Sequence, residues 1–240
     1  MVYLQAEEQL KERIIMVDLK EINNQDPIKR MVEKESGLEE YSPMDPPDAY
    51  SPPVIDAIPY EEMHTCLQRF IDEHTQAKKE LEVFEASLIA FKQSGWKRDK
   101  DIERYFSAFF TYMDNQMVKH HLKEEKVLFP LLQTKLIEHE EHSKGKFPKT
   151  AIDILEDDHL KIMQHLTLMF NFISLATRLP DLNSRALTFD VAAEQGFTLI
   201  ELLKLHIFRE ENVVFPKANK YISVAEFDEI LIQIEAYAQY

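Results

Sequence analysis

Two stretches of the chain carry the same metal-binding residue types at the same spacing. Residues 120–130 and 206–216 both read H-x-x-x-E-E-x-x-x-F-P, with the second copy 86 residues after the first. Upstream of each copy, acidic residues precede another histidine. A fixed-period repeat indicates two copies of one structural unit. The residues of the repeat that we predict to ligate metal are four histidines and two glutamates: His74, His120, Glu124, His159, His206 and Glu210.

The spacing within each copy indicates how these residues would meet. His120 and Glu124 are four residues apart, as are His206 and Glu210, so each pair shares one face of a helix. Each helix can then supply one nitrogen and one oxygen to an interior site, and two glutamates from adjacent helices can bridge two metal ions. Imidazole with carboxylate suits iron, manganese or zinc better than calcium or magnesium. Water at open coordination positions would be the reactive group, so we assign no separate catalytic residue.

A second register is present in the first copy only. His121 and Glu125 also form H-x-x-x-E, shifted by one residue. In the second copy, however, Ile207 occupies the position of His121. The register with His120 and Glu124 fits both copies, and we therefore prefer it.

The elements that position these residues are predicted to be helices. The chain has only four glycines, and its long stretches lack hairpin dipeptides such as Asn-Gly. Apolar residues recur at helical spacing. The predicted helices cover residues 60–94, residues 99–130 with Pro130 as an interruption or kink, 150–177, about 183–216, and a short C-terminal segment from 223 to about 240.

Helix lengths predict that the histidines share one level. His74 lies 21 residues before Gly95, and His120 lies 21 residues after Asp99. An antiparallel hairpin about that turn brings these two histidines together. The midpoint between His159 and His206 likewise falls in a predicted turn at 180–183. We therefore predict an all-α fold, an up-down-up-down four-helix bundle.

Apolar residues are predicted to flank the ligands, where they would form a dry pocket that admits a small gas or are simply part of the hydrophobic core. They lie at helical spacing on both sides of the histidines. They are Phe70, Leu81, Met113, Met117, Leu155, Ile162, Met163, Leu199 and Leu203.

Composition divides the chain and limits its partners. More than half of the eleven prolines lie in residues 42–59, so we expect an N-terminal helix and Pro-rich linker over 1–59, the bundle over 60–220, and a C-terminal helix over 221–240.

A net charge of −15 disfavours nucleic acid and anionic membranes as partners. No apolar run approaches the ~20 residues that span a bilayer. The lone Cys66 excludes an intramolecular disulfide. We expect a cytoplasmic protein, with residues 1–59 open to a protein partner or self-association.

The doubled motif with its paired upstream histidines resembles the hemerythrin-like, or HHE cation-binding, family over residues 60–216. The resemblance implies an up-down four-helix bundle around two non-haem iron ions with a bridging oxo or hydroxo group, manganese and zinc being alternatives. It also implies that the same six residues are the ligands.

Two departures narrow the resemblance. Oxygen-carrying members have a further histidine where this chain has Met163, and an aspartate at longer spacing where it repeats H-x-x-x-E. The ligand set is closer to the di-iron proteins that repair iron–sulfur clusters under stress, which usually carry an N-terminal cysteine-containing domain. Residues 1–59 contain no cysteine. We expect redox activity towards nitric oxide, oxygen or peroxide, or a part in iron delivery or cluster repair. An oxygen-binding or oxygen-sensing module and a bundle with a purely structural metal are the alternatives.

Overall fold

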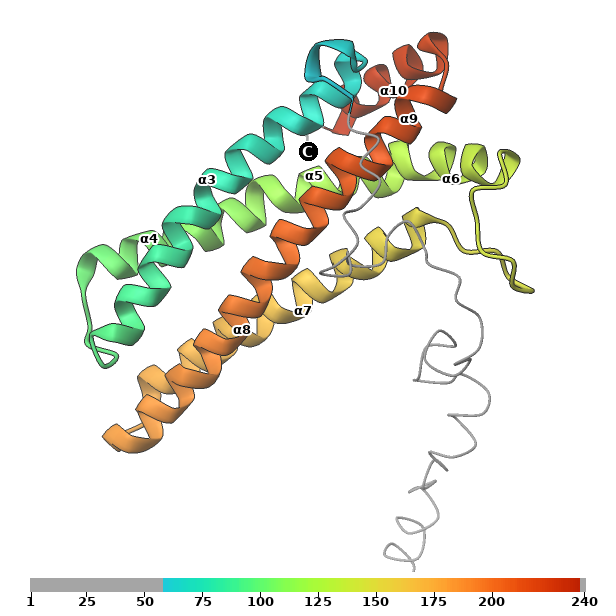
Figure 1. The fold of residues 1–240 in the computed structure, drawn as a ribbon. Helices are drawn as coiled ribbons and strands as arrows, with labels where there is room; N and C mark the ends of the chain where they lie inside the picture. The colour runs from blue at the N-terminus through green and yellow to red at the C-terminus, as the bar shows by residue number, and fades with distance from the viewer. Residues whose placement is uncertain (1–57, 238–240) are drawn as a thin grey trace, which may run out of the picture. The chain divides into compact units, whose positions relative to one another are not determined.

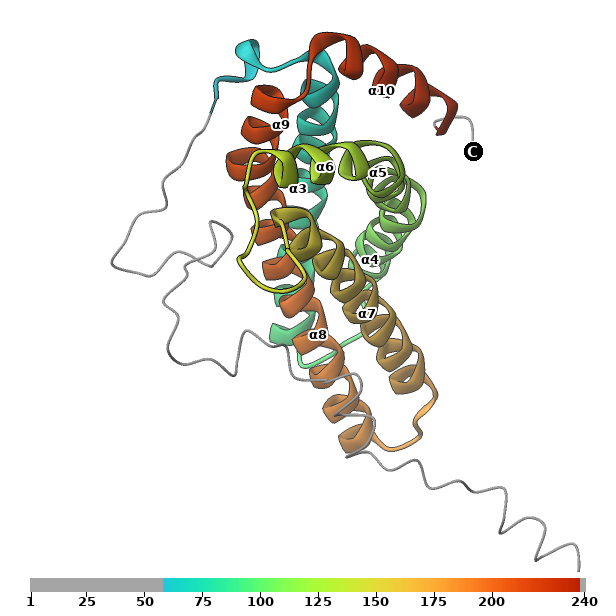
Figure 2. The same ribbon diagram turned by 90° about the vertical axis from the view of Figure 1, so that its right-hand side faces the viewer.

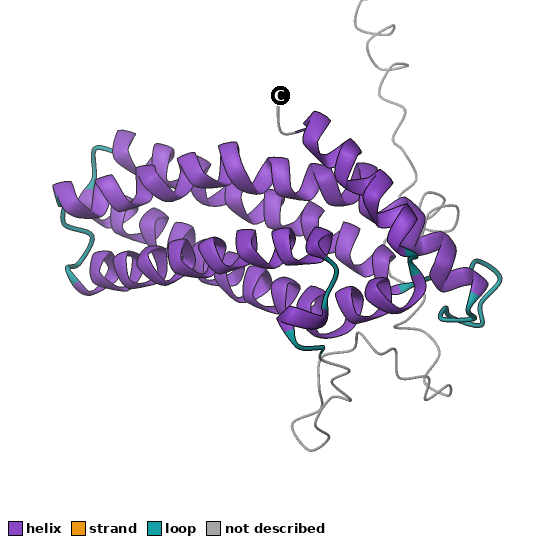
Figure 3. Ribbon diagram, turned by 90° about the horizontal axis from the view of Figure 1, so that it is seen from above, coloured by secondary structure: helices purple, strands orange, loops and turns teal. Residues whose placement is uncertain are grey.

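The computed structural model describes residues 58–237, and every regular element in that part of the chain is helical (Figure 1, Figure 3). The all-α class predicted from the sequence is thereby confirmed. The predicted N-terminal helix and most of the Pro-rich linker lie outside the described residues. Among the described helices, none is long and apolar enough to cross a membrane.

The first long helix, α3, spans Thr65–Gln93 and follows a short 3₁₀ turn at Tyr60–Glu62. The helix was predicted to start at Tyr60. It starts later because His64 caps it, with the imidazole Nδ1 accepting a hydrogen bond from the Cys66 N–H at 3.2 Å. It ends next to Gly95, whose φ of +67° lies in the left-handed region that glycine adopts without strain.

The second helical run is not one continuous helix, as was predicted from residue 99 to Pro130. It consists of α4 (Lys100–Tyr112), a π-helical turn (Met113–Met117), α5 (Val118–Lys123), a second π turn (Glu124–Leu128) and α6 (Phe129–Glu138). Pro130 lies in the first turn of α6. Proline has no N–H to donate to the preceding turn, so the hydrogen-bonding pattern has to change there. The π turn Glu124–Leu128 makes that change, and such turns are frequent at functional sites.

The second half repeats this construction. Helix α7 (Ala151–Arg178) begins with a capping box of Thr150 and Asp153, and α8 (Leu182–Arg209) follows. A π turn at Glu210–Val214 and α9 (Phe215–Tyr221) complete the second copy of the motif. In both copies, therefore, the histidine lies near the end of a helix, the first glutamate opens a π turn, and Phe-Pro opens the next helix.

The long helices run side by side, α3 against α4 and α8, and α7 against α8 (Figure 1, Figure 2). Helix α10 (Val224–Tyr237) packs near the start of α3. The buried apolar side chains form two clusters, one containing Phe70, Phe129 and Phe215, the other containing Phe84 and Phe109. In α3 and α7, the buried histidine of the repeat lies between residues of these two clusters.

Candidate metal centre

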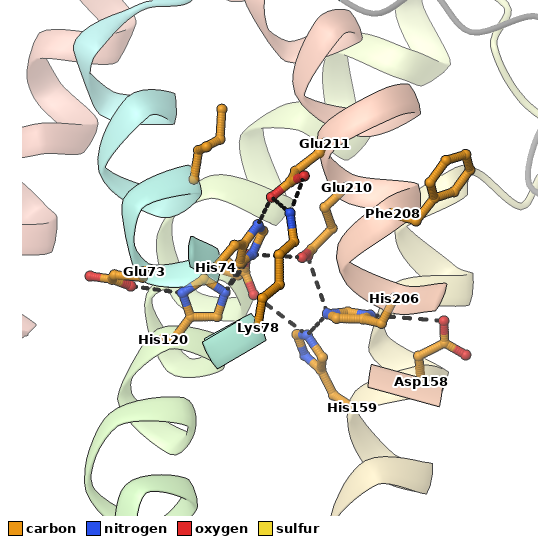
Figure 4. Close-up of polar contacts among 12 residues, drawn as sticks. Glu73, His74, Lys78, His120, Asp158, His159, His206, Phe208, Glu210 and Glu211 are labelled. Carbon is orange, nitrogen blue, oxygen red and sulfur yellow. Dashed lines mark hydrogen bonds and ion pairs between the residues drawn. The ribbon is translucent and has the colours of Figure 1, made fainter. Parts of the chain in front are cut away.

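The six side chains predicted to ligate metal lie together in one buried polar layer. None of the six is more than 3% exposed. The histidines come from four different helices, namely α3, α5, α7 and α8, and each glutamate is the first residue of a π turn. Figure 4 shows four of these imidazoles and Glu210 converging from separate helices.

The imidazoles are arranged as two pairs, each formed within one half of the chain. The Nε2 atoms of His74 and His120 are 3.1 Å apart. The Nε2 atoms of His159 and His206 are also 3.1 Å apart. Each pair therefore directs two nitrogen atoms at the same small volume.

The two glutamates connect the histidine pairs. Glu124 places Oε1 3.3 Å from His120 Nε2 and Oε2 3.5 Å from His159 Nε2. Glu210 places Oε2 3.1 Å from His74 Nε2 and Oε1 3.3 Å from His206 Nε2. Each carboxylate thus has one oxygen atom at each pair, which is the arrangement that two bridging carboxylates adopt between two metal ions.

The donor set fits a two-metal centre. All four carboxylate oxygens of Glu124 and Glu210 are buried without a hydrogen-bond partner. Burying polar atoms without partners costs free energy that a bound cation would offset. Potential ligand atoms of His74, His120, Glu124 and Glu210 all lie within 4.8 Å of one another. Mixed nitrogen and oxygen donors of this kind suit a transition metal.

The charges of the two glutamates are unequal. Burial and the neighbouring Glu124 raise the pKa of Glu210 well above its ordinary value. Burial also acts to raise the pKa of Glu124, but the nearby His120 and His159 outweigh it and hold that pKa well below its ordinary value. Two adjacent buried carboxyl groups do not readily ionise together, so without a cation the pair tends to retain a proton.

A second set of carboxylates lies behind the four histidines. Three of the four imidazoles have their Nδ1 atom within hydrogen-bond distance of a carboxylate, which can only accept a hydrogen bond; the Nδ1 atom of His206 has no hydrogen-bond partner, and Asp158 lies nearest to it. The proton on Nδ1 leaves Nε2 free to ligate, and such partners orient the ring. The oxygen-to-Nδ1 distances are 2.7 Å for Glu73–His120, 2.9 Å for Glu125–His159, 3.2 Å for Glu211–His74 and 3.8 Å for Asp158–His206.

Three basic residues balance part of this acidic set. Lys123 pairs with Glu73, Lys78 lies 2.7 Å from Glu211, and Arg209 lies 2.7 Å from Asp158. Burial acts to raise the pKa values of the three acids, but the facing histidines and these cations outweigh it and lower them. The three carboxylates therefore stay ionised at neutral pH, and Glu73 and Glu211 can keep accepting from Nδ1 of His120 and His74.

Sequence reasoning did not assign these outer carboxylates a role. Glu73 precedes His74 in the chain yet contacts His120, and Glu125 follows Glu124 yet contacts His159. The feature that could have identified them is the repeat itself. Both copies contain an acidic residue before the first histidine and a second glutamate after the first.

The phenylalanine of each motif covers a histidine of the other half. Phe215 stacks on His74, with ring centroids 5.6 Å apart, and Phe129 stacks on His159 at 5.7 Å. Of the nine flanking apolar residues predicted from the sequence, eight are buried. Met163 is the exception at 36% exposure. Met163 lies four residues after His159 on α7, and its side chain lies partly at the protein surface.

His121, from the alternative register, also reaches the layer. It is 5% exposed, and its ring stacks on His159 with centroids 3.8 Å apart. Its Nε2 atom is buried without a hydrogen-bond partner. Potential ligand atoms of His121, Glu124, His159 and His206 lie within 4.8 Å of one another. The site thus contains a fifth imidazole outside the six predicted residues.

A helical protein with paired histidines joined by carboxylates is a metal-binding protein of the hemerythrin type. Residues 65–218 match the family model described as Hemerythrin HHE cation binding domain, and the chain belongs to this family. It is similar to the protein named "Iron-sulfur cluster repair protein YtfE" from Musicola paradisiaca (strain Ech703), with 27% identity over 169 residues. That match covers 69% of this chain and 66% of the relative, just under two thirds of its length. No solved structure matches the chain significantly.

Proposed function

We propose that this chain binds two iron ions in an up-down-up-down four-helix bundle, with Glu124 and Glu210 bridging the ions. One ion would be held by His74 and His120, the other by His159 and His206. The observation that carries the proposal is the placement of one oxygen of each buried, unpartnered carboxylate at each histidine pair. The mixed donors suit iron, manganese and zinc, and iron is preferred because of the name of the similar repair protein.

The protein's own residues would exclude bulk water from the ions and leave some of their coordination positions open. Two imidazoles and two carboxylate oxygens at each position leave coordination open to a small ligand, which argues against a purely structural metal. Bound iron would supply redox chemistry with nitric oxide, oxygen or peroxide. The chain's contribution is to hold Nε2 of His74, His120 and His159 in place through an acceptor on Nδ1, and to exclude water with buried side chains such as Phe70 and Met117.

A role in iron–sulfur cluster repair would then depend on iron or electrons rather than on a thiol of this chain. Cys66 is the chain's one cysteine and is fully buried. Burial raises the pKa of its thiol to about 12, so the nucleophilic thiolate does not form at neutral pH. We therefore favour iron delivery or redox handling of a diatomic ligand. Reversible oxygen binding is the second candidate, because the flanking apolar side chains suit an uncharged gas.

Metal analysis with a paired substitution tests the proposal. The wild type, purified without added metal, should contain two irons per chain by elemental analysis, and Glu124→Ala with Glu210→Ala should contain none. A matched control is Glu82→Ala with Glu201→Ala, which removes two exposed glutamates from α3 and α8. Two irons retained in the Glu124/Glu210 variant would show that other residues hold the metal.

Optical spectra of the loaded protein then separate the functions. Lasting changes on exposure to nitric oxide or peroxide would support redox handling. A coloured species that forms in air and disappears under vacuum would support oxygen binding. A spectrum unaffected by all three, with metal that only raises thermal stability, would contradict both and indicate a structural metal.

A further inference from the structure

His121 is a buried polar side chain to which the proposed function assigns no role. It is 5% exposed, and its Nε2 atom has no hydrogen-bond partner. Leaving a buried polar atom without a partner costs free energy, which a side chain that only fills space need not incur. In the second copy of the repeat the corresponding residue is Ile207, which is 1% exposed and fills its space without that cost. The imidazole therefore indicates a polar partner that is not part of the chain.

The stacking of His121 keeps its nitrogens away from the metal ion that His159 would bind. The two rings are nearly parallel, with 17° between their planes and 3.8 Å between their centroids. An imidazole nitrogen binds a metal ion through a lone pair that lies in the plane of the ring. Two rings stacked face to face therefore direct their nitrogens along separate planes, which do not meet at one ion. His121 lies beside the coordination sphere of that ion and is not a ligand.

The same stacking brings His121 close to anything else that this ion binds. One ring nitrogen of His121 lies within 4.8 Å of potential ligand atoms of Glu124, His159 and His206. Metal bonds to nitrogen and oxygen in protein zinc sites are about 2 Å long, roughly half of the 3.8 Å between the stacked ring centroids. An atom bound to the ion on the side of the His159 ring that faces His121 would therefore lie between the two ring planes. There it is within the usual reach of a hydrogen bond from His121.

We propose that His121 holds the small exogenous ligand of the centre through a hydrogen bond donated by Nε2. This inference rests on the proposed two-metal function and adds to it a residue that contacts the small ligand. A neutral imidazole with its proton on Nε2 is a donor there. Because the second copy has Ile207 at the equivalent position, only the half of the centre next to His159 has this donor. Hydrogen bonds to charged groups are stronger than those to neutral groups, so His121 favours small anions over uncharged molecules of the same size.

Azide binding to the iron(III)-loaded full chain tests the proposal, because azide is a small anion that accepts hydrogen bonds. His121→Phe keeps an aromatic ring against His159 but has no N–H. Its affinity for azide, measured by optical titration, should fall by about 10–100-fold, as expected for the loss of a hydrogen bond to a charged group. Its iron content should stay at two per chain, because His121 is not a ligand. His165→Phe is the matched control on α7, where the ring nitrogen Nδ1 lies 2.9 Å from Gln195 Oε1, and it should bind azide like the wild type.

A measurement on the wild type remains decisive if His121→Phe does not fold. The infrared stretching band of bound azide should shift when H₂O is replaced by D₂O, because the hydrogen bond contains an exchangeable proton, and the shift should be absent in His121→Phe. Equal azide affinities in the two proteins, or a wild-type band that is the same in D₂O, would overturn the proposal. Loss of iron from folded His121→Phe would also overturn it, by showing that His121 holds the metal. Wild-type protein that contains no pair of irons would instead overturn the proposed function, and this inference with it.

Discussion

Replacing Glu210 by glutamine should stabilise the metal-free protein while removing its stabilisation by metal. Glu210 is fully buried, and neither of its oxygens has a hydrogen-bond partner. Burial and the nearby Glu124 raise the pKa of its carboxyl group well above the ordinary value. At pH 7 the unfolded chain has released this proton, whereas the metal-free fold tends to retain it. The folded state then binds more protons, so this group lowers stability as pH rises above about 4.3.

Glutamine has nearly the same shape and no proton to retain. An unsatisfied buried polar group costs about 1–3 kcal/mol, and because the amide keeps part of that cost we expect a gain of about 1–2 kcal/mol for Glu210→Gln. For a chain of this size that corresponds to a rise in Tm of about 2–8 °C. With free iron at 1,000 times its Kd the wild type gains about 4 kcal/mol. The variant lacks one bridging anion and should lose most of that gain.

The assay is thermal unfolding of chelator-treated and iron(II)-loaded protein, prepared without oxygen. The change in Tm caused by Glu210→Gln should be positive in the first state and negative in the second. In the chelated state the difference should grow between pH 5 and pH 8. The matched control is Glu201→Gln, the same substitution at an exposed position of α8, which should change neither state.

Two results would refute this reasoning. A lower Tm for chelated Glu210→Gln would mean that the carboxylate contributes to the fold without metal, so that its burial is not a cost. An equal rise in Tm in chelated and iron-loaded protein would mean that bound metal does not offset the cost of burying Glu210, so that Glu210 is not a ligand. Either result can be interpreted directly, because the variant differs from the wild type only in the replacement of one carboxylate oxygen by an amide NH2 group.

Three further changes test the outer carboxylates, the histidines and the packing. Glu125→Ala removes the acceptor 2.9 Å from Nδ1 of His159 and should weaken iron binding by about 10–100-fold in a chelator competition; unchanged affinity would contradict an orienting role. Burial lowers the pKa of His206 to about 4, so the unfolded chain takes up the proton first as pH falls. In urea unfolding of metal-free protein, protonation of this residue should therefore lower the free energy of unfolding by up to about 3 kcal/mol between pH 6.5 and pH 4, and this contribution should be absent in His206→Gln. Metal loading of the wild type should weaken below about pH 6. Gly196→Ala would place a Cβ 2.8 Å from Leu88 Cδ2 and should lower stability by about 1–3 kcal/mol in thermal unfolding, with iron content unchanged.

Much of the fold follows from local sequence patterns. The turn near Gly95 and the capping box of Thr150 and Asp153 mark helix ends that the structure contains. The equal separations of the histidines from their turns indicated a common level, and their imidazoles do lie in one layer. These features are predictable because each depends on residues close together in the chain.

The π turns were not predictable from apolar spacing. A pattern of buried residues fixes which face of a helix is inside, but it does not distinguish hydrogen bonds to the fourth preceding residue from bonds to the fifth. Pro130 was predicted to interrupt or kink its helix, and the helix of the second copy was predicted to end at about Pro216. Only the structure shows that the π turns begin at Glu124 and Glu210 themselves.

The outer acids and His121 were missed for a different reason. An acidic residue next to a ligand resembles a solvated surface residue, and its partner is on another helix. Whether Glu73 reaches His120 depends on how two helices are rotated against each other, which no single stretch of sequence specifies. His121 was set aside because the second copy lacks it, yet its ring lies in the buried layer against His159.

The contacts between the halves explain why the motif contains more than its ligands. In the second copy Glu210 contacts His74, Glu211 accepts from Nδ1 of the same ring, and Phe215 stacks on it. Each half therefore presents its own pair of imidazoles but depends on the other half for a bridging oxygen, an orienting acid and an apolar cover. A single copy folded alone would bring two histidines together without fixing the first of them. Two complete copies are therefore needed to form either of the two proposed metal positions.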